Sequence, residues 1–480
     1  MQRDPVLAAP SWRRARSSFA PVWLSFLIGC AGSGASAGSV GSAASVGSAA
    51  SIGRVEHSAP PPPAYAPTPE ALAAAQAQLI GAQVLDRAAF VRAVLQVNPT
   101  IEAARQGWRA ALARVRQAGT LEDPMIDLGV APLSVGSGEA PFGFEATVSQ
   151  KLPWFGKRAL EASASAAEAD AVKSDYEAVR RELALSAVML YQQYFIAARS
   201  LEINTAHVEL MRAMRDAAAA LFSSGRGSAQ DALQAEAELA HMEHDAVILA
   251  AQGEVTLAQM NELLHRAPDL PLPPPPQELP PPPPPDAAAS SLQQIATQNR
   301  PDIIAVEQRA KAEQTHSERA EREFYPDLTV STSYNSMWDM PEHRWMIGLG
   351  FNLPIQRGRR EGAADEARAL SAQFEQEAAR LRDAARTQVF VVLKELEESR
   401  HVLLLFETRL LPIARRRIDA ARAGFTASQN PFLAVIDAER SLRGLELEYQ
   451  KARAEHVGRR AELDRAVGRI PGLDWKEGNP

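Results

Sequence analysis

The sequence predicts a mainly α-helical fold with a membrane β-barrel, built from a duplicated unit of helix, strand hairpin, long helix and returning helix. Three observations support this fold class. Alanine is abundant and aromatic residues make up only 6% of the chain, a composition that suits long, closely packed helices. The chain after about residue 86 repeats once at a spacing near 202 residues. Each copy holds two short stretches in which apolar and polar residues alternate, as in strands with two unlike faces.

Residues 1–29 have the pattern of a secretory signal peptide. Four arginines between Arg3 and Arg16 precede an apolar stretch that is too short to cross a bilayer as a helix. The residues that end at Cys30 resemble a bacterial lipobox, which predicts cleavage before Cys30 and a covalent lipid on its sulfur. Because Cys30 is the single cysteine, disulfides within the chain and multi-thiolate metal sites are excluded. An ordinary buried cysteine is the alternative, but the Gly/Ala/Ser-rich residues that follow cannot build a core around it.

The changes of composition along the chain predict its domains. Residues 30–69 form a flexible tether that is rich first in Gly, Ala and Ser and then in Pro. The first repeat is expected over residues 70–265 and the second over 291–470, with a proline-rich linker over 266–290. Residues 471–480 are a C-terminal tail. The net charge of −7, without a sustained basic run, argues against nucleic acid as a partner.

Landmark residues recur in the same order in both copies. The corresponding pairs are Asn98-Pro99 and Arg300-Pro301, Pro124 and Pro326, Leu152-Pro153 and Leu353-Pro354, Gly156-Lys157-Arg158 and Gly358-Arg359-Arg360, and Phe222 and Phe425. The small drift in their spacing corresponds to a few single-residue insertions. We therefore expect the same elements in the same order in both halves.

Each copy is predicted to contain three helices. The expected ranges are about Arg87–Ala118, Arg158–Phe222 and Gln230–His265 in the first copy, and Asp302–Glu323, Arg360–Phe425 and Leu433–Gly468 in the second. The longest helices would extend about 100 Å, which disfavours a compact enzyme fold. In the first copy the two shorter helices together match the long one. In the second copy they fall about two turns short, a gap left to irregular structure, and Pro412 should kink the long helix.

Four strands are expected at about 124–131, 142–152, 326–335 and 344–353. One apolar and one polar face per strand is the pattern of outer-membrane barrels, in which lipid and water lie on opposite sides. The smallest such barrels have about 8 strands, so a closed barrel requires several copies of this chain. A soluble coiled-coil stalk would explain the helical seams equally well, but it gives no reason for the strands. Aromatic residues near the strand ends are candidates for an interface girdle: Phe142, Phe144, Tyr334 and Trp345.

Residues from about 86 to 470 resemble the TolC-like outer-membrane efflux protein family. The resemblance rests on the duplication, on Asn98-Pro99, on the stretch from Leu152 to Arg158, and on two segments of the second copy, 425–428 and 437–442. It implies a homotrimer that forms a twelve-stranded barrel in the outer membrane of a Gram-negative bacterium, continuous with a long periplasmic helical tunnel. Such a lipidated factor would dock on a periplasmic adaptor joined to an inner-membrane efflux pump, and would conduct solutes passively without enzymatic chemistry.

The resemblance also assigns roles near the helical tips. Asp437 matches one position of the family's acidic gate rings, and Ala434 stands where a second aspartate is usual. Three convergent carboxylates would repel one another and attract cations, which makes Asp437 a gate candidate. Asp231 lies near the equivalent tip of the first copy. For both aspartates the alternative is a solvated helix-start residue stabilised by the helix dipole.

Two further tip features follow from the resemblance. The tyrosine and arginine that help to hold the family's tunnel closed are replaced by Phe425 and Asn430, which leaves open whether the hydrogen-bonded connection forms in this chain. The tip turns resemble the adaptor-docking ends of the family, with the candidates Gly225, Arg226, Phe425, Ser428 and Asn430.

No other motif predicts chemistry. Met337, Met340 and His343 could hold copper or silver transiently, but their spacing also fits packing at a barrel end, and we assign no firm metal site. His241 and His244 lack further ligands and fit a solvated helix face. No catalytic constellation and no cofactor site besides the Cys30 lipid is expected. The leading hypothesis is an exit channel for drugs, metal ions or other small compounds, and the alternative is a structural or adhesive coiled-coil surface lipoprotein.

Overall fold

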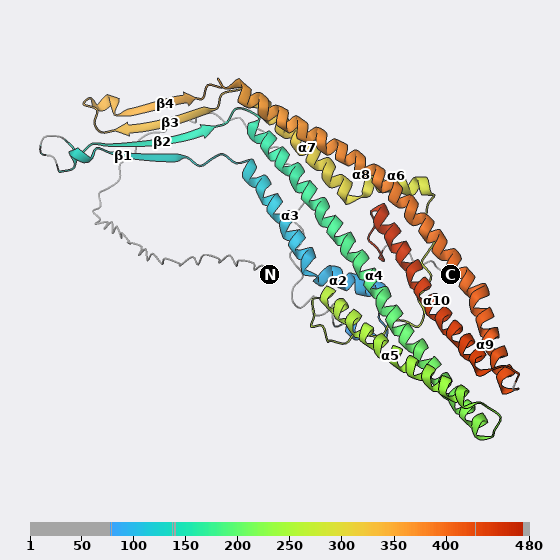
Figure 1. Cartoon of the computed structure of the whole chain (residues 1–480). Coiled ribbons are helices and arrows are strands. Elements are labelled where there is room, and N and C mark those ends of the chain that lie inside the picture. The colour runs from blue at the N-terminus through green and yellow to red at the C-terminus, as the bar shows by residue number, and fades with distance from the viewer. Residues whose placement is uncertain (1–76, 78, 137, 139–140, 428, 474–480) are drawn as a thin grey trace, which may run out of the picture. The chain divides into compact units, whose positions relative to one another are not determined.

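The computed structural model describes residues 77, 79–136, 138, 141–427 and 429–473. The predicted signal peptide, Cys30, the tether, Ser428 and residues 474–480 lie outside these residues. Within the described part, one four-stranded sheet is followed by helices that run side by side (Figure 1). None of the described helices is both long and apolar enough to cross a membrane.

The two hairpins of the duplication form a single antiparallel sheet. Its strands are β1 (Met125–Val130), β2 (Phe144–Leu152), β3 (Leu328–Asn335) and β4 (Trp345–Phe351), in that spatial order. The contact between β2 and β3 joins the copies. The register places Ile126, Val148, Thr332 and Ile347 in one row across the four strands.

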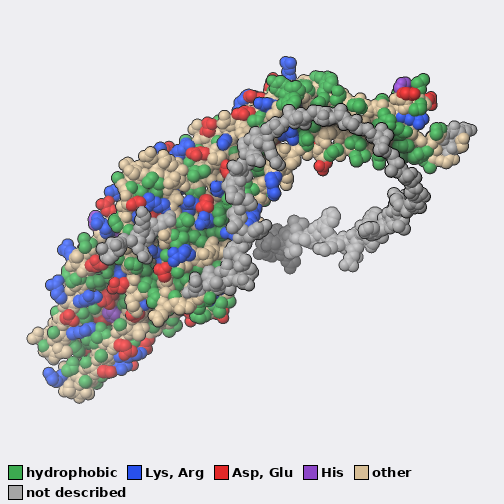
Figure 2. All heavy atoms as spheres, turned by 180° about the vertical axis from the view of Figure 1, so that it is seen from behind, with side chains coloured by type: hydrophobic (Ala, Val, Ile, Leu, Met, Phe, Trp, Pro, Cys, Tyr) green, Lys and Arg blue, Asp and Glu red, His purple; other side chains and the backbone are tan. Residues whose placement is uncertain are grey.

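The predicted alternation produces two unlike sheet faces. The apolar face is open to solvent in a single chain: Leu128 is 77% and Ile347 84% exposed. Side chains alternate between the two faces along each strand, so the residues next to the apolar ones point to the opposite, polar face. Thr147, Ser149 and Ser331 belong to this polar face. Figure 2 shows apolar side chains gathered over the sheet, whereas charged side chains are spread over the helices.

The helices of the first copy are α2 (Arg87–Val97), α3 (Pro99–Ala118), α4 (Lys157–Ser223) and α5 (Ala229–Leu263). The single helix predicted over Arg87–Ala118 is wrong. Asn98 ends α2 and caps α3, because its side chain accepts the N–H of Thr100 at 2.9 Å and Pro99 occupies the first helical position. As predicted, the shorter helices pack along α4: α3 and α5 both contact it.

The helices of the second copy are α6 (Ala289–Asn299), α7 (Pro301–Arg322), α8 (Arg357–Leu405), α9 (Leu411–Thr426) and α10 (Phe432–Val467). Helix α6 was not predicted. It packs on α8 and fills the gap that was assigned to irregular structure.

The predicted helix Arg360–Phe425 is not continuous. A π-helical turn over Phe406–Leu410 separates α8 from α9. This turn directly precedes Pro412, whose ring would clash with the carbonyl four residues earlier and which lacks an N–H donor. The disturbance expected at Pro412 therefore takes the form of a π-helical turn.

Small side chains form the seams between the long helices. Ala164, Ala167 and Ala171 of α4 and Ala364, Ala367 and Ser371 of α8 are all buried, at the three-and-four spacing that the sequence predicted. A separate apolar cluster near the tips includes residues of α4, α5, α9 and α10. The coil of the first copy and the coil of the second copy are thus packed together there.

Candidate gate and docking tips

The tip of the first copy is a polar turn between α4 and α5. Gly225 adopts the left-handed conformation with a φ of 70°, and the N–H groups of Arg226 and Gly227 both donate to the carbonyl of Leu221. Asp231 forms a capping box with Ser228, whose N–H donates to the Asp231 carboxylate at 3.3 Å. Asp231 therefore caps the start of α5. This is the structural alternative to a gate role for Asp231. Gly225 and Arg226 are exposed.

The tip of the second copy closes by aromatic packing. Phe425 is 8% exposed, and its ring lies 5.0 Å from that of the fully buried Phe432. The N–H groups of Gln429 and Asn430 donate to the carbonyl of Gly424. Of the predicted docking candidates here, Asn430 is exposed while Phe425 belongs to the core.

Asp437 lies on the first turns of α10 and is exposed. Among the described residues its carboxylate forms no hydrogen bond or ion pair. Its charge acts at longer range: the pKa of Arg440 is raised first by the hydrogen bond that Arg440 donates to Glu238, and the charge of Asp437 contributes further. An exposed and unpaired carboxylate is free to face the solvent, as the gate hypothesis requires. Ala434, one turn earlier, supplies no second carboxylate.

A polar network that was not predicted from the sequence lies between α4 and α10, next to Asp437. His207 of α4 is placed between two carboxylates of α10: its Nδ1 is 2.5 Å from Oε1 of Glu439, and its Nε2 is 3.0 Å from Oε2 of Glu446. Glu439 is fully buried, and its second oxygen has no hydrogen-bond partner in the part of the chain that the structure describes. Arg415 of α9 approaches Glu446 at 3.5 Å.

Two arginines of α10 extend the same network to α4 and α5. Arg443 donates to Oδ1 of Asn204 at 3.0 Å and contacts Asp245 at 3.2 Å. Arg440 donates through Nε to the buried Glu238 at 2.9 Å. We call this network the coil clamp; it consists of His207, Glu238 and Asp245 on one side and Glu439, Arg440, Arg443 and Glu446 on the other.

The charges of the coil clamp hold His207 in its protonated form. Burial disfavours the imidazolium, but the hydrogen bonds and charges of Glu439 and Glu446 outweigh burial and raise the pKa of His207 to about 9. The hydrogen bond from His207 in turn lowers the pKa of Glu446. At neutral pH His207 is therefore a cation that lies between the side chains of Glu439 and Glu446.

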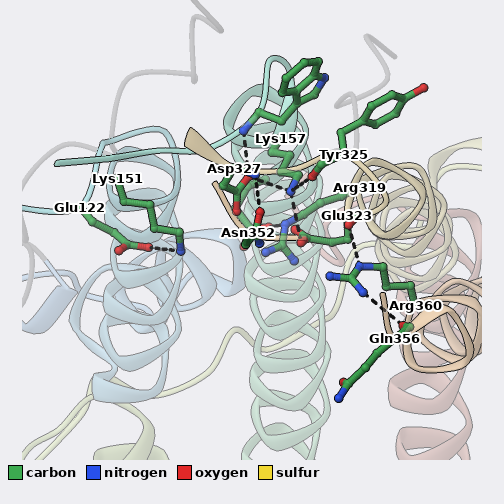
Figure 3. A network of polar contacts seen from close by, with 12 residues as sticks. Glu122, Lys151, Lys157, Arg319, Glu323, Tyr325, Asp327, Asn352, Gln356 and Arg360 are labelled. Carbon is green, nitrogen blue, oxygen red and sulfur yellow. Dashed lines mark hydrogen bonds and ion pairs between the residues drawn. The ribbon is translucent and has the colours of Figure 1, made fainter. Parts of the chain in front are cut away.

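The opposite end of the helices, next to the sheet, contains a second network (Figure 3). Lys157 is 4% exposed, and its Nζ contacts Oδ1 of Asp327 at 2.8 Å, Oε2 of Glu323 at 3.2 Å and the carbonyl of Tyr325 at 3.1 Å. Asp327 also accepts the N–H of Trp154 at 2.9 Å. We call this set of residues, Trp154, Lys157, Glu323, Tyr325 and Asp327, the junction network.

The junction network explains the motif that ends the second strand. Lys157 comes from the first copy, whereas Glu323, Tyr325 and Asp327 come from the second, so the network ties the two copies together where strands become helices. The ring of Trp154 stacks on that of Tyr325 at 5.6 Å. The stretch from Leu152 to Arg158 thus supplies both a stacked aromatic ring and a buried cation.

The loop end of the sheet holds an aromatic row. Ring centroids are 6.0 Å apart for Phe142 and Phe144, 5.5 Å for Phe144 and Tyr334, and 5.2 Å for Tyr334 and Trp345. The row begins at Phe142, just before β2, and continues across β2, β3 and β4; its role as an interface girdle stays a prediction.

The weak metal candidates are exposed near the same end. Met337 is 51% and Met340 61% exposed, and His343 meets the ring of Trp338 edge to face. Among the described residues no group of three His, Cys, Asp or Glu could hold a metal ion. Metal binding by Met337, Met340 and His343 therefore remains a hypothesis without a defined set of ligands.

The sequence profile of the outer membrane efflux protein family matches residues 90–264 and 292–469, once for each copy. The chain belongs to the outer membrane efflux protein family. The cobalt-zinc-cadmium resistance protein CzcC of Cupriavidus metallidurans is 23% identical over 332 residues, which cover 65% of this chain and 74% of that protein.

Solved channels share the fold. CusC superposes with a TM-score of 0.70 at 18% identity, covering 81% of this chain and 93% of CusC. VceC of Vibrio cholerae gives 0.66 at 17% identity, covering 80% and 96%, and the open state of MtrE of Neisseria gonorrhoeae gives 0.65 at 16%, covering 81% and 90%. The fold of this chain is that of an outer-membrane efflux channel.

Proposed function

We propose that this protein is the passive outer-membrane exit channel of a tripartite efflux system, and that it acts as a homotrimer. The observation that supports it best is the sheet with one apolar and one polar face in a member of this family. Four strands cannot close a barrel alone, and β1 and β4 each pair on one side only within the described chain. Three copies would close a twelve-stranded barrel with lipid outside and water inside.

The helices next to these two edges support the same assembly. Along α3 the exposed residues include Ala103, Gly107 and Ala110, and along α8 they include Ala372 and Ala379. Small residues spaced four and three apart on α3 and seven apart on α8 recur on one helix face and allow close helix approach. In the trimer, β4 and α8 of one copy would meet β1 and α3 of the next, so that sheet and helices close together.

The partners and the anchor belong to the same proposal. The tip turns around Gly225 and Asn430 would meet a periplasmic adaptor bound to an inner-membrane pump, and a lipid on Cys30 would add to the hold of the barrel on the outer membrane. Lipid anchorage by one chain is reversible, so the barrel would be the main attachment. No residue is assigned to catalysis.

Divalent metal ions are the cargo that one comparison favours. The name of CzcC assigns it to cobalt, zinc and cadmium resistance, whereas the channel comparisons rest on fold. Deleting this gene and measuring growth in graded cobalt, zinc and cadmium, with an organic antibiotic as the parallel challenge, distinguishes the two cargo classes. Sensitisation to the antibiotic alone would contradict the metal assignment.

The channel itself is tested with the Cys30→Ser protein purified from outer membranes. We expect a trimer in detergent and discrete single-channel currents in planar bilayers. A water-soluble chain that does not conduct would favour the coiled-coil surface lipoprotein instead. The gate assignment is tested in the same setting, because Asp437→Ala should change the size or the cation preference of the current.

A further inference from the structure

We propose that the coil clamp centred on His207 holds the two coils together at the tip of the channel and so keeps the tip closed, and that His207 is the positioning residue for the gate. This inference rests on the proposed channel function and specifies how its tip is regulated. It concerns Glu439, two residues beyond Asp437 on α10, and the face of α4 that packs against it.

The position of the clamp explains how it could act on the gate. Asp437 and Glu439 lie within one turn of α10, so a hydrogen bond that fixes Glu439 also fixes the direction in which Asp437 projects. Besides the clamp, an apolar cluster joins the two coils near the tip, and apolar contacts are non-directional. The clamp therefore supplies the directional part of the coil-to-coil contact.

Opening the tip by separating the coils would break the contacts of the clamp. Glu439 is fully buried and one of its oxygens has no hydrogen-bond partner among the described residues, so removing the His207 charge while the coils stay packed would leave an uncompensated buried carboxylate. Arg440 and Arg443 would lose Glu238 and Asp245 in the same movement. The packed arrangement of the two coils is thus stabilised by several contacts that must break together.

The charged groups of the clamp lie on three helices besides α4. Glu439 and Glu446 of α10 contact the ring of His207, Arg415 of α9 approaches Glu446, and Arg440 and Arg443 of α10 pair with Glu238 and Asp245 of α5. The two carboxylates in direct contact with the ring favour the imidazolium, and deprotonation would remove the charge that joins them. The clamp should hold at neutral and acidic pH and loosen at alkaline pH.

The test compares His207→Gln, Glu439→Gln and the matched control His241→Gln in the Cys30→Ser protein. His241 is an exposed histidine of α5 outside the clamp. We expect His207→Gln to raise the open probability of single channels about tenfold or more at pH 7, since a broken buried pair is costly. Glu439→Gln should move the alkaline rise in open probability to lower pH, and His241→Gln should behave as wild type.

A distance measurement keeps this test independent of conduction. Spin labels at Ser224→Cys and Gln429→Cys, in trimers diluted with unlabelled chain, report the separation of the two tips. We expect a longer or broader distance distribution in His207→Gln than in His241→Gln. If the wild type fails to conduct, the channel proposal fails while the distances still test the clamp. Unchanged distances and an unchanged pH profile in His207→Gln would overturn the clamp.

Discussion

The junction network and the coil clamp both connect the first copy to the second, at opposite ends of the helices, and they differ in the cation that each one uses. Both join the first copy to the second through a buried charge: Lys157 with Asp327 and Glu323, and His207 with Glu439 and Glu446. A lysine stays charged at any ordinary pH, whereas a histidine can lose its proton. The junction therefore uses a side chain whose ordinary pKa is high, whereas the clamp uses one whose loss of a proton can weaken the connection.

The largest effect is expected from removing the junction cation. Lys157→Met should destabilise the protein by about 3 kcal/mol or more, because two carboxylates at the sheet base would lose their partner. Lys151→Met is the control, since Lys151 is about half exposed and its pair with Glu122 lies at the surface. Thermal melting of the trimer in detergent measures both, and equal melting temperatures would contradict a stabilising role for the buried lysine.

Part of this comparison could be predicted from the sequence. The strands and the long helices follow from local periodicity, and the Asn98-Pro99 pair already contained the signal for a helix break, an N-cap followed by proline. The clamp could not be predicted, because His207 and Glu439 are separated by 232 residues and meet only through packing. The charged residues of α10 at 439, 440, 443 and 446 gave a helical spacing but no partner. Helix α6 lacks an N-cap side chain and follows a proline-rich segment, so no local pattern marked it.

The next effect concerns the duplicated phenylalanines Phe222 and Phe425. Phe425→Ala should cost about 3 kcal/mol because its buried ring packs on Phe432, whereas Phe222→Ala should change stability by no more than about 0.5 kcal/mol. Phe222 is 50% exposed although it occupies the corresponding position of the first copy. Limited proteolysis at the two tips reads out each change. Equal sensitivity of the two variants would contradict the difference between a polar and an aromatic tip.

A pH series separates the clamp from the junction. The pKa of His207, about 9, lies above its ordinary value of 6.5, so the folded state holds the extra proton between these values. The stabilisation is complete below about pH 6.5, is lost as the pH rises through 9, and amounts to about 3 kcal/mol. Hydrogen exchange, corrected for its intrinsic pH dependence, should show progressive loss of protection in α10 near Glu439 and no such loss at the start of α4. Uniform protection at pH 9 would contradict a titrating clamp.

The smallest effects distinguish the two tip aspartates. Asp231→Ala should lower stability by about 1 kcal/mol, because it removes the capping box from the start of α5. Asp437→Ala should leave stability within about 0.5 kcal/mol, since the carboxylate is exposed and forms no pair in the described structure, yet it should reduce the cation preference of the current. Paired melting and reversal-potential measurements on both variants assign one aspartate to folding and the other to conduction. If Asp231→Ala alone altered ion preference, the gate would lie at the first tip, and the carboxylate that caps α5 would also face the conduit.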